Sequence, residues 1–281
     1  MTRRIDPGGG PPRRGLPCVC LLPTAYCLPP PVPTFHLERP LCPGAIVTFT
    51  GADAHHLCDV LRVRCGDPLT VCAAGAYWQA VVATVDRHAV AARTVAPAPA
   101  PWRPPRPVYL YQAMPKGRGI ETVIQHASEL GAAVLTPLIT EHTIGRRADG
   151  AGRQGARWQA VAAAAQRQCG RPHPLEIHPV LTFVAALPEL VGALVALPGA
   201  PPIAVPAGGD EVRLVIGPEG GLTPAEHRQL AERGALLFGL PAFTLRAATA
   251  TAAVLAVVNQ AITRTSTPPS PTAVRLTANR S

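Results

Sequence analysis

The sequence predicts a protein of the α/β class, in which a small β domain precedes a larger domain with a mostly parallel sheet. Residues 34–95 contain short runs of alternating apolar and polar residues interrupted by glycines, a pattern typical of a small β-barrel-like domain. From residue 108 onward, strand-like and helix-like segments alternate, which indicates a parallel sheet. The proline-rich segment 96–107 favours a stiff linker. We therefore expect a β domain over 33–98, a linker over 99–107 and an α/β domain over 108–263.

Strands are expected in the β domain at AIVTF, DPLTVCA, YWQAVVATV and AVAARTV. One short helix is expected among them, over residues 51–63. Asp53 can cap the start of this helix, and Leu57, Val60 and Leu61 recur at the spacing of one helical face.

The α/β domain is expected to alternate between apolar strands and amphipathic or alanine-rich helices. The expected strands are VYLYQAM, VLTPLI, LEIHPV, RLVIG and ALLFGL. The expected helices are GIETVIQHASELGA, ARWQAVAAAAQRQCG, TPAEHRQLAERG and ATATAAVLAVVNQAIT.

Both ends of the chain lack a pattern that could bury an apolar face. Residues 1–32 are rich in proline, glycine and arginine, and residues 264–281 contain TSTPPSPTA. We expect both segments to be disordered. An alternative for the first segment is a mis-assigned start, in which Val32 is read from a GUG codon and residues 1–31 are not translated.

Charge and composition restrict the function only broadly. The net charge of +9 includes about +3 from each end segment, which leaves about +3 for the folded part. This permits an RNA partner without requiring one. No apolar run reaches the roughly 18 to 20 residues of a membrane span, so no transmembrane helix is expected. Seven of the eight cysteines lie in the first 72 residues and none forms C-x-x-C, which predicts reduced thiols in a cytoplasmic protein.

The stretch RLVIGPEGGLTPAEHRQLAERGA, residues 213–235, combines an apolar strand, a glycine turn and a capped helix. Thr223 can cap the helix, Pro224 suits its first position, and Glu226 completes a Thr-x-x-Glu capping box. The glycines of the turn allow close approach of a ligand at the carboxyl edge of a parallel sheet. The turn is neither G-x-G-x-x-G nor a P-loop, and a tight turn that holds nothing is the alternative.

A second loop downstream favours the ligand-binding interpretation. LFGLPAFTLRAATA, residues 237–250, also follows a strand and opens a long helix. Two such loops could line one pocket.

Together, these motifs resemble those of a known enzyme family. IGPEGGLTPAEH followed by LFGLPAFTLRAATATAAVLAVVNQ is similar to the cofactor-binding signature of the SPOUT, or α/β-knot, methyltransferases, specifically the RsmE-type 16S rRNA uracil-N3 methyltransferases. The resemblance extends upstream through MPKGRGIETVIQHASELGAAVLTPLITEHT, RWQAVAAAAQRQCGR and AHHLCDVLRVRCGDPLTV. It covers roughly residues 33–262.

The resemblance implies a PUA-like RNA-binding β domain, a C-terminal trefoil-knot domain and a homodimer with the cofactor site at its interface. The knot rests on the resemblance alone, because general folding rules disfavour knots. The implied cofactor is S-adenosylmethionine, and the implied substrate is 16S rRNA of the 30S subunit. The residues that would hold the cofactor are Ile216, Gly217, Pro218, Glu219, Gly220, Leu240, Leu245, Arg246 and Ala247.

Methylation of uracil N3 also requires loss of a weakly acidic proton and stabilisation of charge on O2 or O4. Arg246 is the candidate cation, whereas no general base is assigned. Candidate RNA contacts are Arg62, Arg64, Lys116 and Arg171, since guanidinium and ammonium groups bind phosphate. His55 and His56 fit no metal-ligand spacing, so no metal is expected.

The chain departs from the family pattern at several positions. LRAATA has Ala248 where the family usually has a carboxylate, so that the carboxylate is dispensable or activity is reduced. Thr34 and His142 stand where arginines are usual, and Arg167 stands where an acid is frequent. One alternative function is therefore a non-catalytic RNA-binding or ribosome-assembly protein. The other is a ribose 2′-O-methyltransferase of the same superfamily, which the TLRAATA loop disfavours.

Overall fold

The computed structural model describes residues 34–100, 102–117, 119–143, 151–206 and 208–266. The extension expected over residues 1–32 lies outside this part of the chain. Most of the expected C-terminal tail also lies outside it, but residues 264–266 do not. They belong to the last helix, so the predicted boundary at residue 263 is three residues too early.

The first sheet contains five strands in the order β1-β3-β4-β5-β2. β1 and β3 are parallel, and the other pairs are antiparallel. Four of these strands confirm the sequence prediction, whereas β1 was not among the predicted runs. The strands are β1 (Thr34–Leu37), β2 (Ile46–Thr50), β3 (Pro68–Ala73), β4 (Ala76–Val85) and β5 (Ala89–Ala98).

The predicted helix of this region is present, but two details of the prediction are wrong. α1 (Gly51–His55) continues into a π-helical turn, His56–Val60. Thr50 occupies the N-cap position, and Asp53 lies inside the helix rather than capping it. Only Leu57 of the expected apolar face is buried, since Val60 is 60% and Leu61 37% exposed. The wider π-turn changes the angular spacing on which the predicted face depended.

The second sheet has the strand order β12-β10-β11-β6-β7-β8, and β9 also pairs with β7. All of its pairings are parallel, which confirms the prediction. β9 and β10 were not predicted. The strands are β6 (Val108–Ala113), β7 (Val134–Ile139), β8 (Glu176–Ile177), β9 (Leu181–Thr182), β10 (Leu194–Ala196), β11 (Val212–Ile216) and β12 (Leu236–Phe238).

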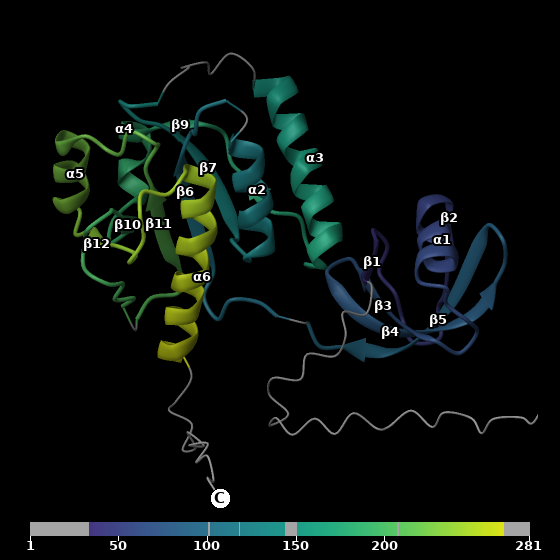
Figure 1. Cartoon of the computed structure of the whole chain (residues 1–281). Coiled ribbons are helices and arrows are strands. Elements are labelled where there is room, and N and C mark those ends of the chain that lie inside the picture. The colour runs from purple at the N-terminus through teal and green to yellow at the C-terminus, as the bar shows by residue number, and fades with distance from the viewer. Residues whose placement is uncertain (1–33, 101, 118, 144–150, 207, 267–281) are drawn as a thin grey trace, which may run out of the picture. The chain divides into compact units, whose positions relative to one another are not determined.

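Helices cover both faces of this sheet (Figure 1). One apolar cluster joins the strands to α2 (Gly119–Glu129), α3 (Ala151–Cys169) and α6 (Ala247–Ser266). A second cluster joins the opposite face to α4 (Phe183–Ala186), the 3-10 turn Leu187–Glu189 and α5 (Pro224–Ala231). The second sheet therefore has the three-layer arrangement typical of α/β domains.

The strand order determines which loops meet at the carboxyl edge of the sheet. β12, β10 and β11 are consecutive neighbours, although β12 follows β11 in the sequence. Because all three run parallel, the segments that follow them emerge at the same edge, where ligands bind in α/β folds. The glycine turn and the second loop identified in the sequence are two of these segments.

Candidate active site

The capping box that starts α5 is formed as predicted. The Thr223 Oγ1 accepts a hydrogen bond from the Glu226 backbone N at 3.2 Å, and the Thr223 N donates to Glu226 Oε2 at 2.8 Å. Pro224 occupies the first helical position. The box fixes the point at which the glycine turn after β11 ends and the helix begins.

The Glu226 side chain also joins this helix to a second loop. The residue is only 6% exposed, and Oε1 accepts a hydrogen bond from the Glu141 backbone N at 3.0 Å. Glu141 belongs to the segment after β7. One buried carboxylate therefore positions two of the loops at the carboxyl edge.

We expect Glu226→Ala to lower the free energy of unfolding by about 1.5–3 kcal/mol, because the buried Thr223 N and the partly buried Glu141 N lose their hydrogen-bond acceptor. Urea unfolding monitored by circular dichroism measures this loss. Glu129→Ala, at an exposed position at the end of α2, serves as the control and should change stability by less than about 0.5 kcal/mol. Equal stability of the two variants would contradict the proposed role.

The glycine turn itself is held from two sides. His142 Nδ1 lies 3.0 Å from the carbonyl oxygens of both Gly220 and Gly221. Because carbonyls only accept hydrogen bonds, Nδ1 carries the proton. On the other side, the Lys116 backbone N donates to Glu219 Oε1 at 3.3 Å. The residues that follow β6 and β7 therefore brace the turn after β11.

The loop after β12 packs closely against the segment after β10. The Gly239 N donates to Pro201 O at 2.7 Å, and the Leu197 N donates to Phe238 O at 2.8 Å. A Cβ atom on Gly239 would lie 2.5 Å from Ala200 O. Glycine is therefore required here for the close approach of two backbones.

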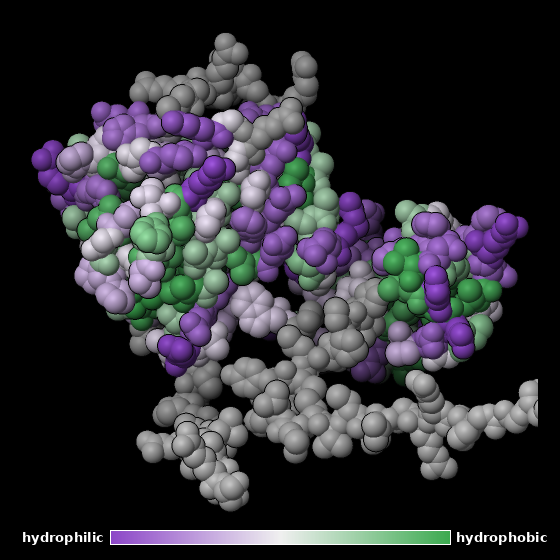
Figure 2. Space-filling view, viewed as in Figure 1, coloured by the Kyte–Doolittle hydropathy of each residue, from purple (hydrophilic) through white to green (hydrophobic). Residues whose placement is uncertain are grey.

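The segments that follow β10, β11 and β12, together with the start of α6, line a cavity at the carboxyl edge. On the face drawn in Figure 2, hydrophobic surface gathers over the region that Figure 1 labels β10, β12 and α6. Of the predicted cofactor residues, Gly220 and Arg246 are not among those that line the cavity. The predicted residues that do line it are Ile216, Gly217, Pro218, Glu219, Leu240, Leu245 and Ala247.

Sequence reasoning missed one wall of this cavity. Ala196, Leu197 and Pro198 line it from β10 and the segment that follows. The only local signal was the Pro-Gly pair after the apolar run ALVAL, and the run itself gave no indication of a separate strand. His227 and Phe243 also line the cavity without having been predicted, and Phe243 is 98% exposed at its rim.

The predicted RNA contacts differ in their environments. Arg62, Arg64 and Lys116 are exposed. Arg171 instead donates from Nη1 to Ser128 O at 3.2 Å and from Nη2 to Ala132 O at 3.0 Å.

Burial lowers the pKa of the Arg171 guanidinium. The structure therefore gives this side chain a different role from the predicted phosphate contact. Arg171 satisfies the Ser128 carbonyl, near the end of α2, and the Ala132 carbonyl in the segment that follows the helix.

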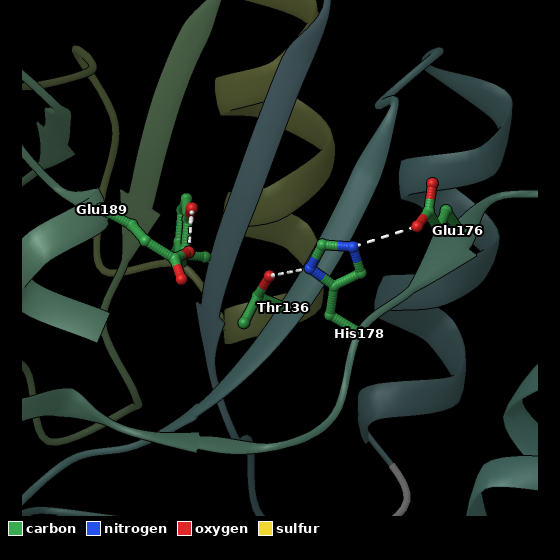
Figure 3. Close-up of polar contacts among 5 residues, drawn as sticks. Thr136, Glu176, His178 and Glu189 are labelled. Carbon is green, nitrogen blue, oxygen red and sulfur yellow. Dashed lines mark hydrogen bonds and ion pairs between the residues drawn. The ribbon is translucent and has the colours of Figure 1, made fainter. Parts of the chain in front are cut away.

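A row of polar side chains away from the cavity superficially resembles a hydrolase triad (Figure 3). The Thr136 Oγ1 lies 3.5 Å from His178 Nδ1, and His178 Nε2 lies 3.1 Å from Glu176 Oε1. Thr136 is only 2% exposed, so its hydroxyl cannot reach a substrate.

Figure 3 also includes Glu189, whose Oε2 accepts a hydrogen bond from the Tyr111 hydroxyl at 2.8 Å. Burial and this bond raise the pKa of Tyr111. The row of Thr136, His178 and Glu176 and the pair of Tyr111 and Glu189 therefore both have structural roles.

Within the described residues, no group of three or more histidine, cysteine or acidic side chains could hold a metal ion. The cysteines at 42, 58, 65, 72 and 169 are free thiols. Among the helices that the structure describes, none combines the length and hydropathy of a membrane span. The cavity at the carboxyl edge is the candidate site, because the segments after β10, β11 and β12 all line it.

Comparison with known proteins identifies relatives of this fold and site. Residues 103–259 match the model of the RNA methyltransferase domain family. A ribosomal RNA small subunit methyltransferase E from Synechocystis sp. is 32% identical over 229 residues, which cover 76% of this chain and 73% of the relative. The protein of the same name from Mycobacterium tuberculosis is 31% identical over 232 residues, covering 76% of this chain and 86% of the relative.

A solved structure agrees with these sequence matches. The ribosomal RNA small subunit methyltransferase E of Neisseria gonorrhoeae, bound to S-adenosyl methionine, superposes with a TM-score of 0.66 at 26% identity. The match covers 82% of this chain and 97% of that structure. The chain therefore belongs to the RNA methyltransferase family and is a relative of the ribosomal RNA small subunit methyltransferase E proteins.

Proposed function

We propose that this protein methylates N3 of a uridine in the 16S rRNA of the small ribosomal subunit, with S-adenosylmethionine as methyl donor. The observation that carries the proposal is the cavity at the carboxyl edge, in a chain that belongs to this family. Three neighbouring parallel strands and the braced glycine turn form this cavity. The Neisseria relative that has the same fold binds S-adenosyl methionine.

The chemistry of the cavity fits this cofactor. Its walls are mostly apolar side chains and backbone, which suit a nucleoside, and the exposed Glu219 carboxylate suits an ammonium group. His227, whose enclosed Nδ1 has no hydrogen-bond partner among the described residues, also lines the cavity. When bound, S-adenosylmethionine supplies an electrophilic methyl group on a sulfonium. Gly217, Pro218 and Leu240 would hold it, while the apolar walls exclude water.

The protein's part in the reaction is to orient the uracil and to stabilise charge. The N3 proton would pass to water as N3 takes up the methyl group that the cofactor would supply. Negative charge on O2 or O4 increases when the proton leaves, so a nearby cation accelerates this step. We assign this role to Arg246, which is exposed at the start of α6. In-line positioning supplies the remainder of the catalysis.

The wider organisation of the protein follows from the same proposal. Residues 33–98 form a PUA-like domain that binds RNA through Arg62 and Arg64, and a linker over 99–107 joins it to a SPOUT domain over 108–263. In that domain the chain forms a trefoil knot, and Lys116 contacts RNA. A homodimer in the cytoplasm acts on the 30S subunit. The five-stranded sheet and the parallel α/β sheet support this division.

Transfer of labelled methyl from S-adenosylmethionine to 30S subunits that lack the modification tests whether the protein is an enzyme. We expect label in 16S rRNA and none in reactions without protein. Ala248 makes this test informative, because its side chain packs against the apolar core where the family usually has a carboxylate. Binding of cofactor and subunits without transfer would instead identify a non-catalytic assembly protein.

A further inference from the structure

His227 is a polar residue in the wall of the cavity, and the described part of the protein leaves one of its ring nitrogens without a hydrogen-bond partner. It lies on α5, and its backbone N donates to Thr223 O at 2.9 Å, which keeps it next to the capping box. Its side chain lines the cavity. Its Nδ1 is fully enclosed and has no hydrogen-bond partner in the part of the chain that the structure describes.

The surroundings of His227 make this nitrogen unusual. Of the other cavity-lining side chains, Glu219 and Thr244 carry polar groups, and both residues are exposed. His227 is the only basic side chain among the lining residues that the structure describes. A buried polar atom without a partner destabilises the protein, and such an atom in a cavity is satisfied when a suitable ligand binds.

We propose that His227 Nδ1 hydrogen-bonds the adenine edge of the bound cofactor. This inference rests on the proposed function, because it requires a cofactor with an adenosine group. The charged amino-acid end of S-adenosylmethionine needs exposed polar partners, and the Glu219 carboxylate provides one. The adenine ring is flat and largely apolar, but its edge carries neutral donors and acceptors. An enclosed imidazole nitrogen between apolar walls complements that edge.

The proposal predicts opposite effects on stability and on ligand affinity. His227→Phe replaces an unpartnered polar ring with an apolar ring, so the Tm of the ligand-free protein should rise or stay constant. The same change removes a hydrogen bond to the ligand, so we expect affinity for S-adenosylhomocysteine to fall by roughly fivefold, as for one neutral hydrogen bond. A histidine with a purely structural role would not produce this combination.

The test uses the full-length protein and non-reacting ligands. Calorimetry gives the Kd of S-adenosylhomocysteine, and competition against it gives the Kd of adenosine. Both should increase by the same factor in His227→Phe, whereas His227→Asn, which keeps a polar atom near the position of Nδ1, should restore most of the affinity. Arg228→Ala, at the exposed neighbouring position on α5, should bind both ligands as the unmodified protein does.

Each other outcome has a distinct meaning. If the unmodified protein does not bind S-adenosylhomocysteine, the proposed function itself fails. If it binds and His227→Phe binds equally well, the inference about His227 is wrong. A variant with lower Tm and lower affinity would indicate a structural histidine and would overturn the inference. Weaker binding of S-adenosylhomocysteine with unchanged binding of adenosine would overturn the assignment to adenine.

Discussion

Replacement of Gly239 with alanine is expected to destabilise the protein and to abolish most of its methyl transfer. The new Cβ would lie 2.5 Å from Ala200 O, 2.9 Å from Ala200 N and 3.0 Å from Leu197 O. All three are backbone atoms, so the segment after β10 must move as a unit. Overpacking of this kind costs about 1–3 kcal/mol. Because Leu197 lines the cavity, a shift of about 1 Å should also reduce transfer by about 100-fold.

Urea unfolding and transfer assays on Gly239→Ala measure the two effects. Gly155→Ala is the matched control, since Gly155 lies within α3 and its added Cβ meets no atom within 4 Å. This control should gain about 0.5–1 kcal/mol, because alanine is the better helix former. If Gly239→Ala were as stable and active as Gly155→Ala, the two backbones would not be in the close contact that the structure gives them.

Replacement of Arg246 with alanine should separate catalysis from cofactor binding. Arg246 is exposed and is not among the cavity-lining residues, although its neighbours Leu245 and Ala247 are. We therefore expect the Kd of S-adenosylhomocysteine to stay constant. The kcat of methyl transfer should fall by about 100- to 1000-fold, the typical loss when one group that stabilises an oxyanion is removed. Arg246→Lys should retain part of the rate, because lysine keeps the charge but not the planar donor geometry.

Single-turnover transfer at saturating cofactor, together with calorimetry, distinguishes the possibilities. A lower kcat with unchanged Kd supports the assigned cation. An equal loss of cofactor affinity would show that Arg246 acts on the cofactor instead. An unchanged kcat would leave Arg246 as a solvated side chain at the start of a helix.

The features that could be predicted from the sequence depend on neighbours in the chain. The capping box at Thr223 and Glu226 has both partners within one helical turn, so a four-residue pattern specifies it. The alternation of apolar strands and helices similarly specified the parallel sheet. The glycine turn could be recognised as one side of a site because it lies between a predicted strand and the capping box of the next helix.

The features that were missed depend on contacts between distant segments. β10 is three residues long, and it lies between β11 and β12 although it precedes both in the sequence. Strand order, rather than a local pattern, therefore sets the position of the loop after β10 and its close contact with Gly239. The same holds for the position of His227. Arg171 was assigned to RNA because an arginine in sequence shows only its charge. Its carbonyl partners, Ser128 and Ala132, lie about 40 residues away in the chain.

The proposed reaction places the methyl group on N3 of a uracil. Digestion of 16S rRNA to nucleosides after transfer, followed by mass spectrometry against standards, identifies the methylated atom. We expect 3-methyluridine as the labelled product. It should be absent from reactions of the Arg246→Ala variant that are stopped at early times. Label in a 2′-O-methylated nucleoside, or in a methylated base other than uracil, would contradict the proposed reaction.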